Sequence, residues 1–149
     1  MNAIRRHVPT AARLVLGLVF TTFGLNFFLH FLPMPPPPPR ALVAMSGLMA
    51  NGHLMPLAHA TELVAGVLLL TGLFVPLALT LLAPLIVNIV AFHLAFAPSG
   101  LGLAVLVLAL EIGLGWAYRS AFAPMLRART PLPAAVRRPS ANEELRAIA

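Results

Sequence analysis

The stretch that decides the fold is LAHATELVAGVLLLTGLFVPLALTLLAPLIVNIVAFHLAFAP, residues 57–98, in which Glu62 is the only side chain with a fixed charge at neutral pH. A helix needs roughly 20 apolar residues to cross a bilayer, so this run is long enough for two crossings. Gly72 and Pro76 fall near its middle, where a glycine suits the end of one helix and a proline suits the start of the next. The stretch therefore predicts an antiparallel pair of membrane-spanning helices over residues 57–73 and 76–97.

The composition of the whole chain agrees with this interpretation. Of its 149 residues, 60% are hydrophobic and 9% are charged, and the mean hydropathy is +0.92. Soluble domains of this size are not that apolar, so the composition indicates an integral membrane protein with one domain. The chain contains no cysteine, which excludes thiol redox chemistry, disulfide exchange and iron–sulfur ligation.

Two further apolar runs flank the central pair. Residues 11–32 predict a retained first crossing, because the run ends in HFLPMPPPPP and lacks the small-residue exit of a cleaved signal peptide. Residues 101–118 predict a fourth crossing. On the first helix, Gly17, Thr21 and Gly24 recur at helical spacing, which permits the close approach of a neighbouring backbone.

The segment between the first and second crossings is too short to span the membrane. Its proline run, residues 33–39, predicts a stiff polyproline II spacer, with a docking site for a proline-reading domain as the alternative. Residues 41–51 predict a short interfacial or partly re-entrant helix closed by Gly52. The predicted fold class is therefore all-α, an integral membrane bundle of four transmembrane helices over residues 1–126. Residues 127–149 form a basic tail that we expect to be disordered.

The charges predict an orientation. All ten basic residues are arginine, and the formal net charge is +6. Nine of the ten lie in the N-terminal segment up to Arg13 or in the C-terminal segment from Arg119, and Arg40 alone lies on the other side. The positive-inside rule then predicts a bacterial plasma membrane protein with both termini in the cytoplasm. The bilayer is the expected partner, and nucleic acid is not, because no aromatic-interleaved basic face accompanies the charge.

Polar residues within the crossings are expected to face the protein interior and to mark the functional site. A rise of about 1.5 Å per residue from the outer helix ends puts most of them in the outer half of the bundle. Asn88 and His93 point about 140° apart on one helix, so they cannot both face one small cavity. Glu111 either joins the cluster or reaches toward Arg13. The candidate ligand-binding cluster, led by Glu62, comprises Glu62, His59, Asn26, Asn88, His93 and Glu111.

Two interpretations of this cluster stay open. A carboxylate and imidazoles in an apolar pocket can exchange protons with a quinone or another small polar headgroup that enters from the lipid. Alternatively, the same groups form a buried hydrogen-bond network that locks the helices into register. The five histidines also raise the question of a haem site, in which two imidazoles from facing helices would bind the iron. His30 and His93 are the only suitable pair for this role. No three-histidine spacing for zinc occurs, so no metal is expected.

Two segments on either side of the proline run carry a further signal: RLVLGLVFTTFGLNFFLHFLP at residues 13–33 and ELVAGVLLLTGLFVPLALTLLAPLIVNIVAFHLAFAPSG at residues 62–100. They resemble the DoxX family of small four-helix membrane proteins, over about residues 13–127 in all. The positions that match the family pattern are Gly17, Gly24, Asn26, Glu62, Gly66, Gly72, Pro76, Pro84, Asn88 and His93.

The resemblance implies a four-helix bundle in the plasma membrane and an association with redox proteins. A related subunit belongs to a thiosulfate:quinone oxidoreductase, and a DoxX protein has been linked with superoxide dismutase and a sulfurtransferase in a membrane complex. Most members have no assigned reaction, so the resemblance specifies the fold more closely than the chemistry.

Together these observations predict a membrane subunit that binds a quinone or a similar amphiphile in the outer half of its bundle and works with redox protein partners. A quinone is the candidate cofactor. The alternative is a non-enzymatic scaffold or lipid-binding protein, in which the polar cluster is purely structural. A transporter or channel would need polar residues that continue to the inner face, where the sequence has almost none. An exposed small-residue stripe and the basic tail leave a homo-oligomer open.

Overall fold

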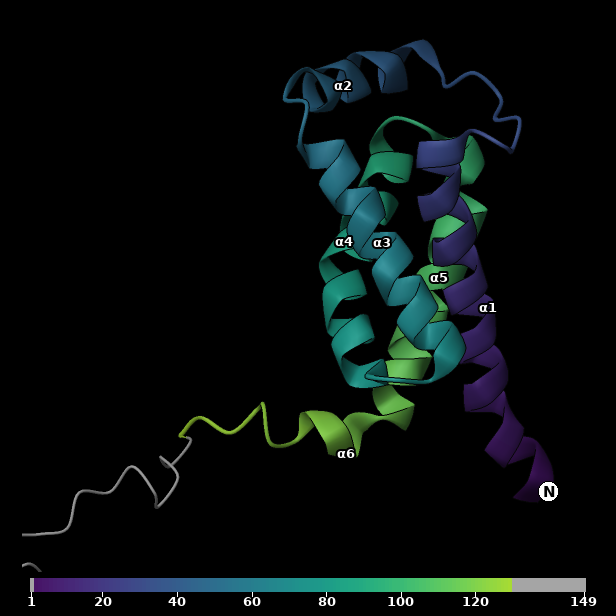
Figure 1. Cartoon of the computed structure of the whole chain (residues 1–149), viewed down its shortest axis with the longest axis vertical. Helices are drawn as coiled ribbons and strands as arrows, with labels where there is room; N and C mark the ends of the chain where they lie inside the picture. Colours follow the sequence, from purple (N-terminus) through teal and green to yellow (C-terminus); the bar gives the residue numbers. More distant parts are fainter. Residues whose placement is uncertain (1, 130–149) are drawn as a thin grey trace, which may run out of the picture.

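Figure 1 shows the computed structural model of the chain, which describes residues 2–129. Within this range the protein is built from helices and contains no strand. Most of the tail predicted over residues 127–149 lies outside the described residues. The elements, in chain order, are α1 (Asn2–Leu29), α2 (Pro39–Ala50), α3 (Leu54–Thr71), α4 (Val75–Ala95), the 3-10 turn η1 (Pro98–Gly100), α5 (Leu101–Ala117) and α6 (Arg119–Phe122).

Four of the described segments are long and apolar enough to cross a membrane, namely His7–Leu29, Leu54–Thr71, Val75–Ala95 and Pro98–Ala117. This confirms the predicted all-α bundle of four membrane-spanning helices with a short helix between the first and the second. Each of the four also carries large apolar side chains on its outer surface, as contact with lipid requires. Examples from α1, α3, α4 and α5 are Leu18, Val64, Val87 and Ile112.

The first crossing ends at Leu29 rather than at the predicted Leu32, because the chain turns at His30. His30 has a φ of 51°, in the left-handed region, and its amide donates to the Asn26 carbonyl at 2.8 Å. The Asn26 side chain then accepts a hydrogen bond of 2.7 Å from the Leu32 amide. These bonds satisfy backbone groups at the helix end and direct the chain into the proline run.

Helices α1 and α3 form the most extensive helix pair, and glycines let their backbones approach. A Cβ added at Gly17 would lie 3.0 Å from the Gly66 carbonyl oxygen, and one at Gly24 would lie 2.9 Å from the His59 carbonyl oxygen. A Cβ at Gly66 would meet the Thr21 Oγ1 atom at 2.6 Å. The small-residue stripe predicted on the first helix therefore packs inside the bundle. This corrects the expectation that the stripe is exposed and available to a second copy of the chain.

A tight turn at Gly72 joins α3 to α4, as the sequence predicts. Gly72 has a φ of 77°, and Pro76 lies in the first turn of α4. Arg13 on α1 donates from its guanidinium to the carbonyl oxygens of Leu69 and Leu70, in the last turn of α3. A cation at that position also suits the negative end of the helix dipole.

The two ends of the bundle differ. Helix α2 lies across one end, whereas the N-terminus of α1 and the short α6 lie at the opposite end (Figure 1). We call the half of the bundle next to α2 the α2 half, and the other the α6 half. The largest fully buried side chains lie mainly in the α6 half, where apolar groups fill the interior. They are Leu16, Leu69, Leu79, Leu82, Ile86 and Leu114.

Candidate ligand-binding cavity

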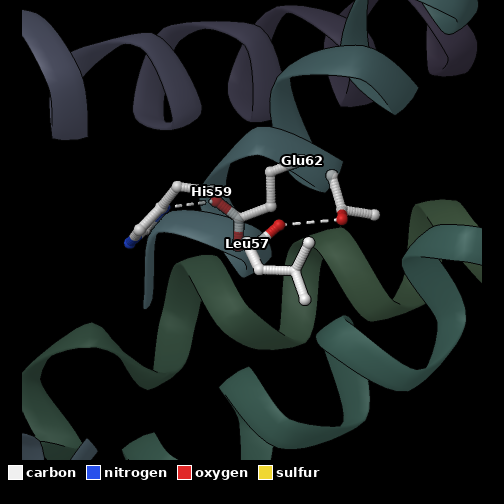
Figure 2. Close-up of polar contacts among 4 residues, drawn as sticks. Leu57, His59 and Glu62 are labelled. Atoms are coloured by element: carbon white, nitrogen blue, oxygen red, sulfur yellow. Dashed lines mark hydrogen bonds and ion pairs between the residues drawn. The ribbon is translucent and has the colours of Figure 1, made fainter. Parts of the chain in front are cut away.

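A histidine and a glutamate on one face of α3 form the only ion-pair contact among the described residues. His59 Nδ1 lies 2.7 Å from Glu62 Oε2, and Figure 2 shows the two groups joined across one turn of the helix. Residues three apart lie next to each other on a helix, which explains the pairing. The neighbouring Thr61 hydroxyl donates instead to the Leu57 carbonyl at 2.8 Å. His59 is therefore the hydrogen-bond partner of the buried Glu62 carboxylate.

Helix α1 holds the His59 ring in place. The ring stacks on Phe27, with ring centroids 4.2 Å apart and planes inclined by 21°. Gly24 lies one turn earlier on α1, and the backbone at this glycine nearly touches the backbone at His59. Phe27 was not among the site residues predicted from the sequence. The signal for it is its helical spacing of three residues from Gly24, which puts both on the face that packs against α3.

His93, near the end of α4, supplies the third polar side chain. Its Nδ1 atom lies 2.8 Å from the Ile89 carbonyl oxygen, and because a carbonyl only accepts, Nδ1 carries the hydrogen. The ring also rests on the backbone of Gly100, where an added Cβ would overlap the ring atoms. Any larger residue at position 100 would displace the ring. The sequence predicts this glycine only as part of a turn, so its role at the site follows from the structure alone.

These three side chains line a cavity of about 330 Å³ in the α2 half. With a helical rise of about 1.5 Å per residue, Glu62 lies about 12 Å from the start of α3 and His93 about 3 Å from the end of α4. Met34 and Leu103 are exposed as well as lining the cavity, so the cavity opens to the surface beside them. The remaining lining residues are Val19, Phe20, Phe23, Ile89, Gly100, Ala104 and Val107. The site is thus an apolar pocket with three polar groups in its wall.

The two asparagines of the predicted cluster lie outside the cavity lining. Asn26 is buried, and its side chain holds the end of α1 through the Leu32 amide. Asn88 is exposed, and its side-chain nitrogen donates to the Pro84 carbonyl at 2.8 Å. The structure therefore separates Asn88 from Glu62. The physical reason is the angle between positions 88 and 93 on α4, which turns Asn88 toward the lipid when His93 faces the cavity.

Glu111 is buried in α5 but does not line the cavity. It lies one helical turn beyond Val107, which does. Its Oε2 atom is shielded from solvent and has no hydrogen-bond partner among the described residues. Arg13, the other partner considered for Glu111, donates to carbonyl groups of α3 instead. The structure thus joins Glu111 neither to the cluster nor to Arg13.

The buried polar groups do not form a network that ties the helices together. His59 bonds to Glu62 within α3, and His93 bonds to Ile89 within α4. Between membrane-spanning helices, the only side-chain hydrogen bonds in the described part of the chain come from Arg13. This corrects the interpretation of the cluster as a hydrogen-bonded lock. It leaves polar groups of the cavity wall available to a ligand.

The histidine pair considered for haem is not brought together at this cavity. His93 lines it, whereas His30 is exposed in the turn after α1 and is not part of the lining. Among residues 2–129, no group of three or more His, Cys, Asp or Glu side chains is placed to hold a metal ion. Met34 also lines the cavity. It was not predicted from the sequence, because nothing in the proline run indicates that one of its residues faces the bundle.

Comparison with known proteins identifies the family. The sequence profile of the DoxX family matches residues 8–95, which include α3, most of α1 and all of α4. His59, Glu62 and His93 all fall within the matched range, whereas the α5 wall of the cavity falls outside it. No curated protein and no solved structure matches the chain significantly. The family match covers more than half of the sequence, and the chain is therefore a member of the DoxX family.

Proposed function

We propose that the cavity binds the ring headgroup of a quinone, in its oxidised or reduced form, or of a comparable amphiphile, and that the protein acts as a membrane subunit alongside a redox partner. The observation that carries this proposal is the convergence of Glu62, His59 and His93 on one apolar cavity. Ligand sites are typically apolar clefts with a few placed polar groups that fix orientation.

The size and position of the cavity support an amphiphile. Its volume of about 330 Å³ is at the lower end of the roughly 300–1,000 Å³ typical of small-molecule sites. That space suits one substituted ring and not a long tail as well. Leu103, on the lipid-facing surface of α5, stands at the opening. A ring in the cavity with its tail in the bilayer fits this arrangement.

The polar groups suit proton exchange with such a ring. The Glu62 carboxylate and the His59 imidazole share one hydrogen bond. Both side chains can accept a proton from a ring oxygen or return one to it. His93 stands on the neighbouring helix α4 and lines the same cavity. The role of these residues would be to orient the ring and to move protons at its oxygens.

A second candidate is a lipid-binding protein without a reaction of its own. The specific observation in its favour is the apolar character of the cavity wall, which suits an acyl chain as well as a ring. An acyl chain makes no use of Glu62, His59 or His93. The two candidates therefore differ in the chemical identity of the occupant.

Native mass spectrometry of the protein released from detergent tests both candidates. Ala104 lines the cavity and is 2% exposed, so Ala104→Leu fills part of the cavity. Ala109 is exposed on the same helix, so Ala109→Leu is the matched control with the same added volume. We expect added decylubiquinone or its quinol to form an adduct with the wild-type protein and with Ala109→Leu, but not with Ala104→Leu.

A phospholipid adduct that disappears in Ala104→Leu would favour the lipid-binding candidate. If no adduct depends on position 104, neither ligand occupies the cavity, and a scaffold role would be the better description.

We also propose a bacterial plasma membrane location with both termini in the cytoplasm. The N-terminus of α1 and the short α6 lie at one end of the bundle, and Arg40 in α2 lies at the other (Figure 1). Six of the seven arginines among the described residues belong to the segments at the first end, and the positive-inside rule then supports a cytoplasmic location for that end. Because the chain has no cysteine, Ser46→Cys in α2 and Ser120→Cys in α6 give single labelling sites. A membrane-impermeant maleimide should label only Ser46→Cys in intact cells, and the reverse pattern would invert the proposed orientation.

A further inference from the structure

We propose that the cavity selects the hydroxyl-bearing form of its ring ligand, the quinol, over the oxidised quinone. This inference rests on the proposed function, because it specifies which ligand the same cavity prefers. It follows from the hydrogen-bonding state of the three polar side chains in the wall.

His93 presents an acceptor. Its Nδ1 hydrogen is used by the Ile89 carbonyl at 2.8 Å. In a neutral imidazole, the second nitrogen then has a lone pair and no hydrogen. The Nε2 atom of His93 therefore accepts hydrogen bonds and cannot donate one.

The pair on α3 also presents acceptors. In the form of the pair with a neutral imidazole and an ionised carboxylate, His59 Nδ1 donates to Glu62 Oε2 across their 2.7 Å contact, because an ionised carboxylate only accepts. The neutral His59 ring then has its lone pair on Nε2, and the second Glu62 oxygen makes no hydrogen bond with any described residue. The stack on Phe27 fixes the plane of the His59 ring. With both imidazoles neutral and Glu62 ionised, all three polar side chains in the wall offer lone pairs to a ligand.

Among the described residues, no further side chain with a hydrogen-bonding group lines the cavity. Its remaining lining residues are apolar side chains and Gly100. A quinone ring has two carbonyl oxygens, which only accept. Neither these oxygens nor the acceptors in the wall would then have a hydrogen-bond donor. A quinol has two hydroxyl groups, which donate. Because an unmade hydrogen bond in a buried site is costly, the wall favours the quinol.

The test compares decylubiquinol with decylubiquinone by isothermal titration calorimetry of the detergent-solubilised protein, in the absence of oxygen. The dimethyl ether of the quinol serves as a probe of similar shape that cannot donate. We expect the quinol to bind about tenfold or more tightly than either the quinone or the dimethyl ether, since hydrogen bonds to charged acceptors are among the stronger ones.

Variants distinguish a preference for the quinol that arises in the cavity from one caused by unequal partitioning of quinol and quinone into the detergent. Glu62→Gln replaces an acceptor by an amide that also donates, and His93→Phe keeps a ring over Gly100 but removes the acceptor. In both variants the ratio of quinol to quinone affinity should fall toward one. Asn88→Leu removes an exposed polar group from the same helix as His93 and should leave the ratio unchanged.

Two results would overturn the inference, and they are distinguishable from failure of the proposed function. If the quinone binds as tightly as the quinol to the wild-type protein, the selectivity is absent while the cavity still binds the ring. If the selectivity is present but survives in both Glu62→Gln and His93→Phe, these acceptors do not cause it. If neither form binds, the proposed function fails together with the inference.

Discussion

The close contact of α1 and α3 makes Gly66→Ala the sharpest test of the structure. An added Cβ at Gly66 would lie 2.6 Å from both the amide nitrogen and the Oγ1 atom of Thr21, and 3.0 Å from the Gly17 carbonyl oxygen. Ordinary van der Waals contacts between carbon atoms are roughly 3.5–4.0 Å. The methyl group is therefore about 1 Å too close, and two of the three obstructing atoms belong to the backbone and cannot rotate away. The two helices would have to separate.

The size of the effect follows from the cost of overpacking. Forcing an extra carbon into a well-packed interior typically costs about 1–3 kcal/mol. Replacing a helical glycine by alanine also brings a gain in helix propensity of up to about 1 kcal/mol. Gly113→Ala on α5 brings the same gain without the clash, because no atom lies within 4 Å of the added Cβ. The difference between the two variants therefore isolates the packing cost.

Unfolding by titration with SDS, followed by circular dichroism, measures this difference. We expect Gly66→Ala to be less stable than Gly113→Ala by about 1–3 kcal/mol. The separation of α1 from α3 should also loosen the stack between Phe27 and His59, because these residues lie on the same pair of helices. Equal stability of the two alanine variants would refute the close packing of α1 against α3.

Three further substitutions test other contacts. Arg13→Met should lower the free energy of unfolding by about 1–3 kcal/mol, because the hydrogen bonds to the end of α3 are lost. Glu111→Met should leave thermal stability in detergent unchanged or raise it, because the substitution removes a buried oxygen without a partner among the described residues. A large loss of stability would indicate that Glu111 has a hydrogen-bond partner. Asn88→Leu should change stability by less than about 0.5 kcal/mol in the same assay, since its side chain is exposed and bonds only to its own helix.

The fold was largely predictable because each membrane-spanning helix can be recognised from its own segment of the sequence. Length and hydropathy identify a membrane-spanning helix without reference to its neighbours, and Gly72 and Pro76 mark the turn between α3 and α4 by their own backbone preferences. The pairing of His59 with Glu62 was also accessible, because residues three apart on a helix are neighbours whatever surrounds them. Boundaries were less accurate where a side chain decides them, as Asn26 does at the end of α1.

The candidate site was predictable only in part. Helical geometry separates Asn88 from His93, but it does not say which of the two faces inward. The packing of α4 against its neighbours decides this and turns His93 to the cavity. Phe27, Met34 and Gly100 belong to other elements of the chain, and only the folded bundle brings them to His59 and His93.

The sequence by itself determined that this chain crosses the membrane four times and that a few polar residues share one half of the bundle, because the cost of polar groups in lipid acts on each segment separately. The tertiary structure alone decided which of those residues share a cavity, because that depends on how each helix is rotated about its axis. The rotation of α1 and α3 is set by glycines whose missing side chains let two backbones meet. Glu62, His59 and His93 consequently line one cavity, whereas Asn26, Asn88 and Glu111 do not.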